Sequence, residues 1–268
     1  MNRSRKKWSI VIDNGIGVYD RGYWMETIKL FCFPYAGASA MVYNNWRKSL
    51  NSHIQLVPIE LAGRGTRYSE DYYQDFNEMV EDVYHIVKDQ IDDQSPYALL
   101  GHSMGSWLAF ELTYKIMSEH RHPPMHVFFS ARRAPHLPND ELDVNGLSME
   151  SVKETIFKLG GTPKEIYEND EMMNAFLPII YADFKVMNTF KYVNREEKLP
   201  CAISVMSGKE DKEISISNLL GWKEHSQLGC KIYRLPGGHF FQNEHVEQVT
   251  TIINDVLIGQ TLQTQSLI

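Results

Sequence analysis

Residues 97–105 read Tyr-Ala-Leu-Leu-Gly-His-Ser-Met-Gly, an apolar run that leads into a G-x-S-x-G pattern. The apolar run predicts a buried strand, and the residues from Trp107 onward predict a helix directly behind it. A tight turn from strand to helix exposes a serine above the sheet. Gly101 and Gly105 leave room at such a turn where a β-carbon would clash. We therefore predict that Ser103 is a nucleophile; the alternative is an ordinary glycine-rich turn.

The composition is that of an ordinary globular protein. The chain has 268 residues, of which 43% are hydrophobic and 23% charged, enough for one large α/β domain with an insertion. The net charge of −7 argues against nucleic acid as a partner. No apolar run approaches the ~18 residues of a transmembrane helix, so no membrane contact is expected. Cys32, Cys201 and Cys230 lie in apolar runs, which favours buried thiols in a reducing compartment and a cytoplasmic location.

Strand-like and helix-like segments alternate along most of the chain. Strands are expected at residues 28–33, 54–59, 97–100, 127–130, 201–206 and 230–235, and helices through Trp46 and Leu50, at 76–91, at 104–117 and at 243–257. This alternation predicts a mostly parallel central sheet with helices on both faces. Residues 1–24 are expected to be a peripheral extension, and residues 25–268 a single domain.

The alternation stops between about residues 137 and 198, where the sequence is helix-like throughout. One interpretation is a helical lid that lines an acyl-binding channel, with Gly160 and Gly161 as hinges. The alternative is a helical subdomain that packs its apolar stripe. The residues expected to form the wall of the channel are Met173, Phe176, Ile180 and Phe184.

A serine nucleophile needs a base, and the base needs a carboxylate that orients it. In α/β-hydrolases these residues follow one another in the order Ser, Asp/Glu, His. Residues 236–241 read Pro-Gly-Gly-His-Phe-Phe after a predicted strand, and the two glycines let His239 approach the serine. His102 adjoins the serine, but adjacent side chains on such a turn point apart. We therefore predict that His239 is the base.

The orienting acid is expected after the strand at residues 201–206. Asp211 is the first choice, Glu210 the second, and Asp183 in the insertion a distant third. The tetrahedral intermediate also needs two backbone N–H donors. We predict Met104, just after the nucleophile, and Ala36, in the loop after the first strand of the sheet.

No metal or nucleotide cofactor is expected. His120, His122 and His126 cluster on a polar connection, which is usually solvated rather than metal-binding. The sequence has neither a phosphate-binding Walker loop nor a G-x-G-x-x-G pattern, and these are the usual signs of bound nucleotides.

Several blocks, in this order, resemble the type II thioesterases of non-ribosomal peptide and polyketide synthesis. They are Phe31–Gly37, Leu61–Arg67, Gly101–Gly105, Gly208 with Asp211, and Pro236–Phe241. The family's second glycine is replaced here by Ala38, and residues 1–24 have no counterpart. The resemblance implies an α/β-hydrolase fold and a Ser-Asp-His triad. It also implies hydrolysis of acyl or aminoacyl thioesters on the phosphopantetheine arm of carrier proteins, which removes misprimed groups. The substrate carries the phosphopantetheine, so the enzyme needs no cofactor.

An acidic carrier would need a basic docking patch on this acidic chain. The candidates are Arg64, Arg67, Arg132 and Arg133, and the alternative for each is surface charge or structural pairing. A triad also fits a small-molecule esterase, a lipase or an acyltransferase. A non-catalytic binding module of the same fold is the alternative from another class.

Overall fold

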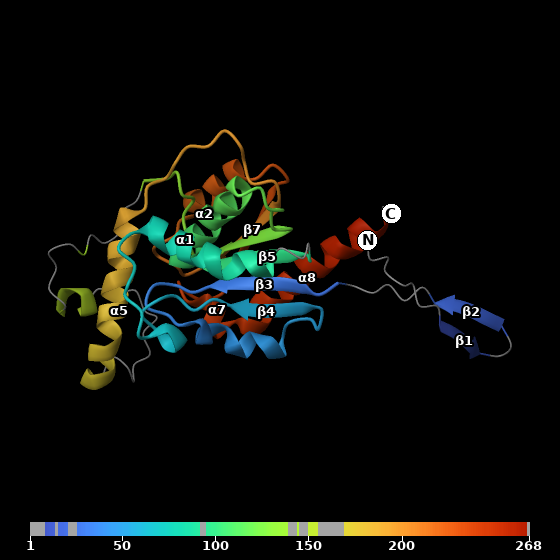
Figure 1. Ribbon diagram of the computed structural model, residues 1–268, viewed down its shortest axis with the longest axis horizontal. Coiled ribbons are helices and arrows are strands. Elements are labelled where there is room, and N and C mark those ends of the chain that lie inside the picture. The colour runs from blue at the N-terminus through green and yellow to red at the C-terminus, as the bar shows by residue number, and fades with distance from the viewer. Residues whose placement is uncertain are drawn as a thin grey trace.

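The computed structural model describes residues 9–13, 16–20, 26–91, 95–138, 144, 150–154 and 169–266. Within these residues, six strands form a parallel sheet in the order β4-β3-β5-β6-β7-β8 (Figure 1). Their bounds are β3 Ile28–Phe33, β4 Ile54–Pro58, β5 Tyr97–His102, β6 His126–Ser130, β7 Ala202–Gly208 and β8 Cys230–Leu235. Two further strands, β1 Ser9–Asp13 and β2 Ile16–Asp20, pair antiparallel with each other. The predicted strands and the α/β-hydrolase architecture are confirmed.

The strands are separated by helices. The α-helices are α1 Phe76–Val87, α2 Met104–Ser118, α5 Asp170–Thr189, α6 Ile216–Leu220, α7 Phe241–Glu244 and α8 Val246–Ser266. Short 3₁₀ helices are η1 Ala40–Lys48, η2 Gly65–Arg67, η3 Lys88–Gln90 and η4 Gly221–His225. The predicted helix around Trp46 is thus a 3₁₀ helix, and the one predicted for 76–91 changes to 3₁₀ geometry after Val87. Among these helices, none is long and apolar enough to cross a membrane.

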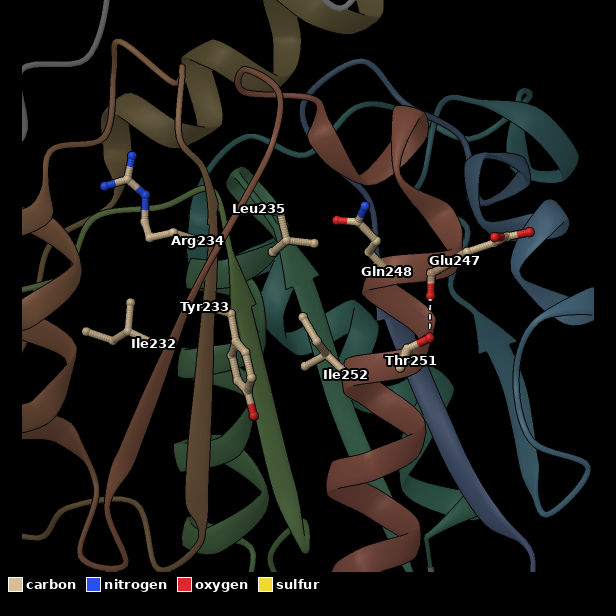
Figure 2. A pocket seen from close by; sticks show the side chains of 8 residues that line it. All are labelled: Ile232, Tyr233, Arg234, Leu235, Glu247, Gln248, Thr251 and Ile252. Atoms are coloured by element: carbon tan, nitrogen blue, oxygen red, sulfur yellow. Dashed lines mark hydrogen bonds between the residues drawn. The ribbon is translucent and has the colours of Figure 1, made fainter.

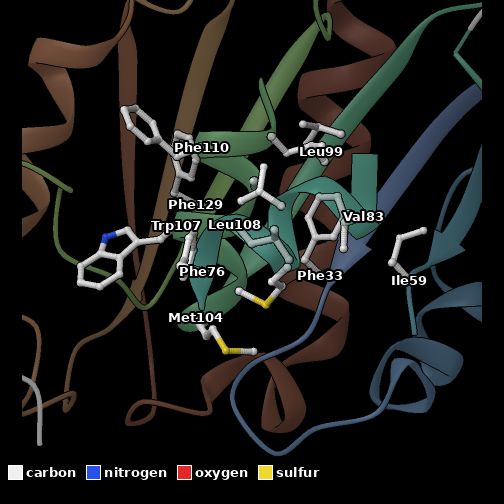
Figure 3. Close-up of a cluster of buried hydrophobic side chains, with 14 of the residues drawn as sticks. Phe33, Ile59, Phe76, Val83, Leu99, Met104, Trp107, Leu108, Phe110 and Phe129 are labelled. Carbon is white, nitrogen blue, oxygen red and sulfur yellow. The ribbon is translucent and has the colours of Figure 1, made fainter. Parts of the chain in front are cut away.

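Alternate residues of the strands build two cores, one on each face of the sheet. Phe31, Leu99 and Phe129 belong to a core that includes side chains of α1 and α2. Figure 3 shows part of this core, with Leu99 and Phe129 labelled. Leu30, Leu100 and Phe128 belong to the core on the other face, together with side chains of η1 and α8. Because both faces are covered, each central strand is an almost continuous apolar run, which explains why the sequence predicted the strands well.

The parallel register brings the carboxyl ends of the strands to one edge of the sheet. Phe33 pairs with Gly101, Gly101 with Phe129, and Ser130 with Met206. The loops that follow β3, β5 and β7 therefore start side by side. This edge of an open parallel sheet is where active sites of α/β proteins are found.

Helix α5 lies across this edge (Figure 1). Met173, Ile180 and Phe184 are buried, and Phe176 packs partly buried against the same core as α1 and α2. Gly160 and Gly161 lie outside the described residues, so the predicted hinge stays a prediction.

Candidate active site

The turn between β5 and α2 is tight, as the sequence predicted, and its backbone is strained at Ser103. Ser103 has φ +52° and ψ −115°, a conformation that L-residues adopt only where the surroundings impose it. A β-carbon at Gly101 would lie 1.9 Å from the carbonyl oxygen of Gly105. One at Gly105 would lie 2.2 Å from the carbonyl oxygen of Phe33. Both positions therefore require glycine.

Two serines that sequence reasoning missed support this turn. Ser103 N–H donates to the carbonyl oxygen of Ser130 at 2.8 Å. The buried Ser106 hydroxyl lies 2.8 Å from the carbonyl oxygen of Gly101 and accepts from the N–H of Ser130 at 3.0 Å. These contacts tie the first turn of α2 to the ends of β5 and β6. The available signal was the serine at position 106, which lies in the apolar first half of helix α2.

The structure brings Ser103, His239 and Asp211 together. His239 Nε2 lies 3.0 Å from Ser103 Oγ, and His239 Nδ1 lies 3.0 Å from Asp211 Oδ2. The second oxygen of Asp211 accepts from the N–H of Glu213 at 2.9 Å. The Asp211 side chain is 0% exposed and that of His239 is 13% exposed. The carboxylate is thus shielded from water, while the imidazole remains within reach of a substrate.

Glycines also fix the two loops that carry the histidine and the acid. A β-carbon at Gly208 would lie 2.2 Å from the carbonyl oxygens of Gly237 and Gly238, so the end of β7 touches the histidine loop directly. Gly237 has φ +94°, and its carbonyl oxygen accepts a hydrogen bond from the N–H of Glu210 at 3.0 Å. The Glu210 side chain is exposed. Of the two neighbouring carboxylates, it is Asp211 that contacts the imidazole.

His102 has a different environment from His239, although it adjoins the serine. It is fully buried, and its Nδ1 lies 2.8 Å from Ser130 Oγ. Burial, and then the nearby His239, hold the pKa of His102 well below its usual range. A buried imidazole that stays neutral and points at β6 does not serve as the base for Ser103.

The loop after β3 forms a tight turn beside the start of α2. Ala38 N–H donates to the carbonyl oxygen of Tyr35 at 3.0 Å, and Gly37 at the third position has φ +82°. These are the features of a type II turn. The close contact of Gly105 with Phe33 places this loop against the turn that bears the nucleophile. Ala36 and Met104, the predicted oxyanion donors, thus lie on two segments that touch.

Burial contradicts the prediction that Arg64 docks a partner. The Arg64 guanidinium donates two hydrogen bonds to Asp183, at 2.5 and 2.6 Å, and both side chains are 2% exposed. Although burial opposes the charge, the ion pair with Asp183 leaves the pKa of Arg64 raised. The alternative of structural pairing is therefore the one the structure supports. Asp183 is engaged here and is not the acid of the triad.

Of the other predicted docking arginines, Arg132 is buried, whereas Arg67 and Arg133 are partly exposed. Arg132 is only 5% exposed, and its guanidinium lies 3.5 Å from the centre of the Trp107 ring, so the docking prediction is wrong for Arg132 as well. Arg67 is half-buried between Asp82 and Glu70. Arg133 is partly exposed and donates to the carbonyl oxygen of Pro138 at 2.7 Å. Docking by Arg67 and Arg133 stays a prediction.

A separate hollow of about 640 Å³ lies between residues 232–235 of β8 and one side of α8 (Figure 2). Glu247 and Thr251, which line it, are joined by a hydrogen bond within the helix. Ser103, Asp211 and His239 do not line this hollow. The described part of the chain contains no group of three His, Cys, Asp or Glu side chains that could hold a metal.

Comparison with known proteins agrees with this geometry. The family model of the thioesterase domain matches residues 28–257. The protein named linear gramicidin dehydrogenase LgrE, from Brevibacillus parabrevis, is 33% identical over 233 residues, covering 86% of this chain and 88% of that protein. The crystal structure of ClbQ from the colibactin NRPS/PKS pathway has a TM-score of 0.83 and 32% identity, covering 90% of this chain and 99% of ClbQ. The type II thioesterase BorB from the borrelidin biosynthetic cluster has a TM-score of 0.77 and 28% identity, covering 85% and 92%.

Proposed function

Because the chain belongs to the thioesterase domain family, we propose that it releases acyl and aminoacyl groups from the phosphopantetheine arm of carrier proteins. The chain is a thioesterase, and its resemblance to the type II thioesterases is confirmed. In this role it edits an assembly line for a non-ribosomal peptide or polyketide by removing misprimed groups. The relatives support a substrate bound to a carrier protein, since ClbQ comes from an NRPS/PKS pathway and BorB is a type II thioesterase from a biosynthetic cluster.

The single observation that carries the mechanism is the chain of contacts from Ser103 to His239 to Asp211. Ser103 Oγ attacks the thioester carbonyl while His239 Nε2 takes the hydroxyl proton. Asp211 holds the imidazole in the required tautomer and stabilises the imidazolium. The thiol of the pantetheine arm leaves with the proton from His239, and an acyl-serine remains. Water, activated by the same histidine, then hydrolyses this ester and restores Ser103.

The developing oxyanion needs donors that are already in place. We assign this role to the backbone N–H groups of Met104 and Ala36. Met104 lies at the N-terminus of α2, where free N–H groups and the helix dipole favour a negative charge. Ala36 lies in the turn that touches the nucleophile turn, and its small side chain leaves space for the substrate.

The acyl chain would lie against α5. Ile180 packs directly on Gly37, since a β-carbon there would lie 2.3 Å from Ile180 Cγ1. Helix α5 thus places an apolar side chain next to the turn that carries Ala36. The same helix also carries Met173, Phe176 and Phe184. Flexible methionine and aromatic side chains suit acyl groups of varied shape.

The experiment compares two substrates with the same acyl group, one on a carrier protein and one on free pantetheine. Contacts with the carrier help to position the carbonyl, so kcat/KM is expected to be higher for the acyl-carrier. Arg133→Glu should raise KM for the carrier substrate and leave acyl-pantetheine unaffected. Equal efficiencies for the two substrates would contradict the editing role and leave a general esterase.

The name of the relative LgrE, a dehydrogenase, suggests hydride transfer. The sequence of this chain has no G-x-G-x-x-G pattern to support that activity.

A further inference from the structure

We propose that Asp183 is a positioning residue for the oxyanion hole, because together with Arg64 it fixes the turn that carries the Ala36 N–H. The inference rests on the proposed function, in which Ala36 is an oxyanion donor. Asp183 comes from α5, Arg64 from the loop after β4, and the turn from the loop after β3. One buried carboxylate thus joins three segments beside the nucleophile.

The contacts converge on the Asp183 carboxylate. Its Oδ2 accepts the N–H of Gly37 at 2.6 Å and an Arg64 N–H at 2.5 Å, and its Oδ1 accepts a second Arg64 N–H at 2.6 Å. The same Arg64 also donates to the carbonyl oxygen of Ala38 at 3.5 Å. The pair therefore holds the turn at two consecutive residues, Gly37 and Ala38.

The geometry of the turn explains why this matters for catalysis. Type I and type II turns differ by a rotation of their central peptide, which here joins Ala36 to Gly37 and carries the Gly37 N–H. The Ala36 N–H belongs to the preceding peptide, so it is held through the backbone of Ala36, which the fixed central peptide restrains from one side. The hydrogen bond from Gly37 N–H to a carboxylate stabilises the observed type II orientation, and charge-assisted bonds of this kind are strong. A backbone oxyanion donor has no side chain that can hold it in place. Its position depends on bonds made by neighbouring residues, and Asp183 provides the one at Gly37.

If the Arg64–Asp183 pair only stabilised the fold, a variant that lacks the pair and still folds would keep the kcat of the wild type. Replacement of a buried ion pair by apolar residues of similar volume often leaves stability unchanged. The double variant Arg64→Met with Asp183→Leu should therefore fold, but it cannot accept the Gly37 N–H. For this variant we expect kcat for acyl-pantetheine to fall about 100-fold, as when an oxyanion donor is lost or displaced. KM should change less than about threefold, and the pH–rate profile should keep its shape.

Two further measurements make the test specific. An acyl trifluoromethyl ketone forms a hemiketal with Ser103 whose oxyanion occupies the hole, so its inhibition constant should rise by the same factor as kcat/KM falls. Asp183→Asn keeps one acceptor oxygen for Gly37 N–H and should retain more kcat than the double variant. We expect a loss of about 10-fold for Asp183→Asn, which decides the question if the double variant does not fold.

Each outcome supports the inference or overturns it. Wild-type kcat in a folded double variant, or in Asp183→Asn, would show that the pair only stabilises the fold. A fall in kcat with no change in affinity for the trifluoromethyl ketone would also overturn the inference. Ser103→Ala, measured in parallel, separates the two proposals. If Ser103→Ala keeps its activity, the proposed function fails; if it is inactive while the double variant is fully active, only the role of Asp183 fails.

Discussion

Two motif-rich regions meet at the carboxyl edge of the sheet, and they use their polar residues in opposite ways. In the turn at Ser103 and the loop at His239, side chains are aimed at one another at a position that a substrate can reach. In the block at residues 61–67, Arg64 is buried and Arg67 is half-buried, and both bind carboxylates. In the proposed function, the first region supplies the reacting groups and the second region holds backbone in place. A sequence motif can thus mark chemistry or the scaffold that supports it.

The largest expected effect lies in the first region. Ser103→Ala should lower kcat for thioester hydrolysis by about 10⁶, as loss of the nucleophile does in other triads, with little change in the thermal unfolding midpoint. The measurement is thiol release from acyl-pantetheine, with unfolding followed by circular dichroism. Ser217→Ala, at an exposed serine of α6, is the matched control. Residual activity above a few per cent in a clean preparation would contradict the assignment of the nucleophile.

The next effect separates two adjacent carboxylates. Asp211→Asn should lower kcat by about 10⁴ because the imidazole loses the partner that fixes its tautomer. Glu210→Gln should have little effect, since that side chain is exposed and only its backbone contacts the histidine loop. Both variants are assayed with acyl-pantetheine under saturating conditions. A large loss in Glu210→Gln together with an active Asp211→Asn would reverse the assignment.

The sequence predicted the first region almost completely, because its signals are local. The strand, the glycines and the helix around Ser103 lie within about fifteen consecutive residues, and the order of the triad follows from the fold. The second region could not be predicted in the same way. Arg64 and Asp183 are 119 residues apart, and nothing in the block at 61–67 shows that a helix from the insertion covers it. An arginine beside glycines looks the same whether it faces solvent or a buried carboxylate.

The third prediction tests the contrast between the two regions through the free energy of unfolding. Asp183→Ala leaves the Arg64 charge buried without its partner, which typically costs about 3–5 kcal/mol of unfolding free energy. Glu70→Gln, which removes an exposed partner of Arg67, should change the stability little. Urea unfolding measures both, with Ser103→Ala as the reference from the first region. If Asp183→Ala is no less stable than Glu70→Gln, the buried pair does not hold the second region together.

The smallest effect concerns His126, which belongs to neither region. Its replacement tests how much of the loss of unfolding free energy in acid comes from the buried core. Its Nε2 lies 2.9 Å from Ser204 Oγ between β6 and β7, and burial lowers the pKa of His126 to about 3. A histidine in the unfolded chain titrates near 6.5. The unfolded chain therefore binds more protons between about pH 6.5 and pH 3, and the unfolding free energy falls as the pH drops through this range.

His126→Gln should make that fall shallower, while His53→Gln, at an exposed position, should leave it unchanged. Urea unfolding in steps from pH 7.5 to pH 4.5 measures the slope. Identical slopes in wild type and His126→Gln would show that the acid sensitivity arises elsewhere, with the buried His102 beside the nucleophile as the next residue to replace.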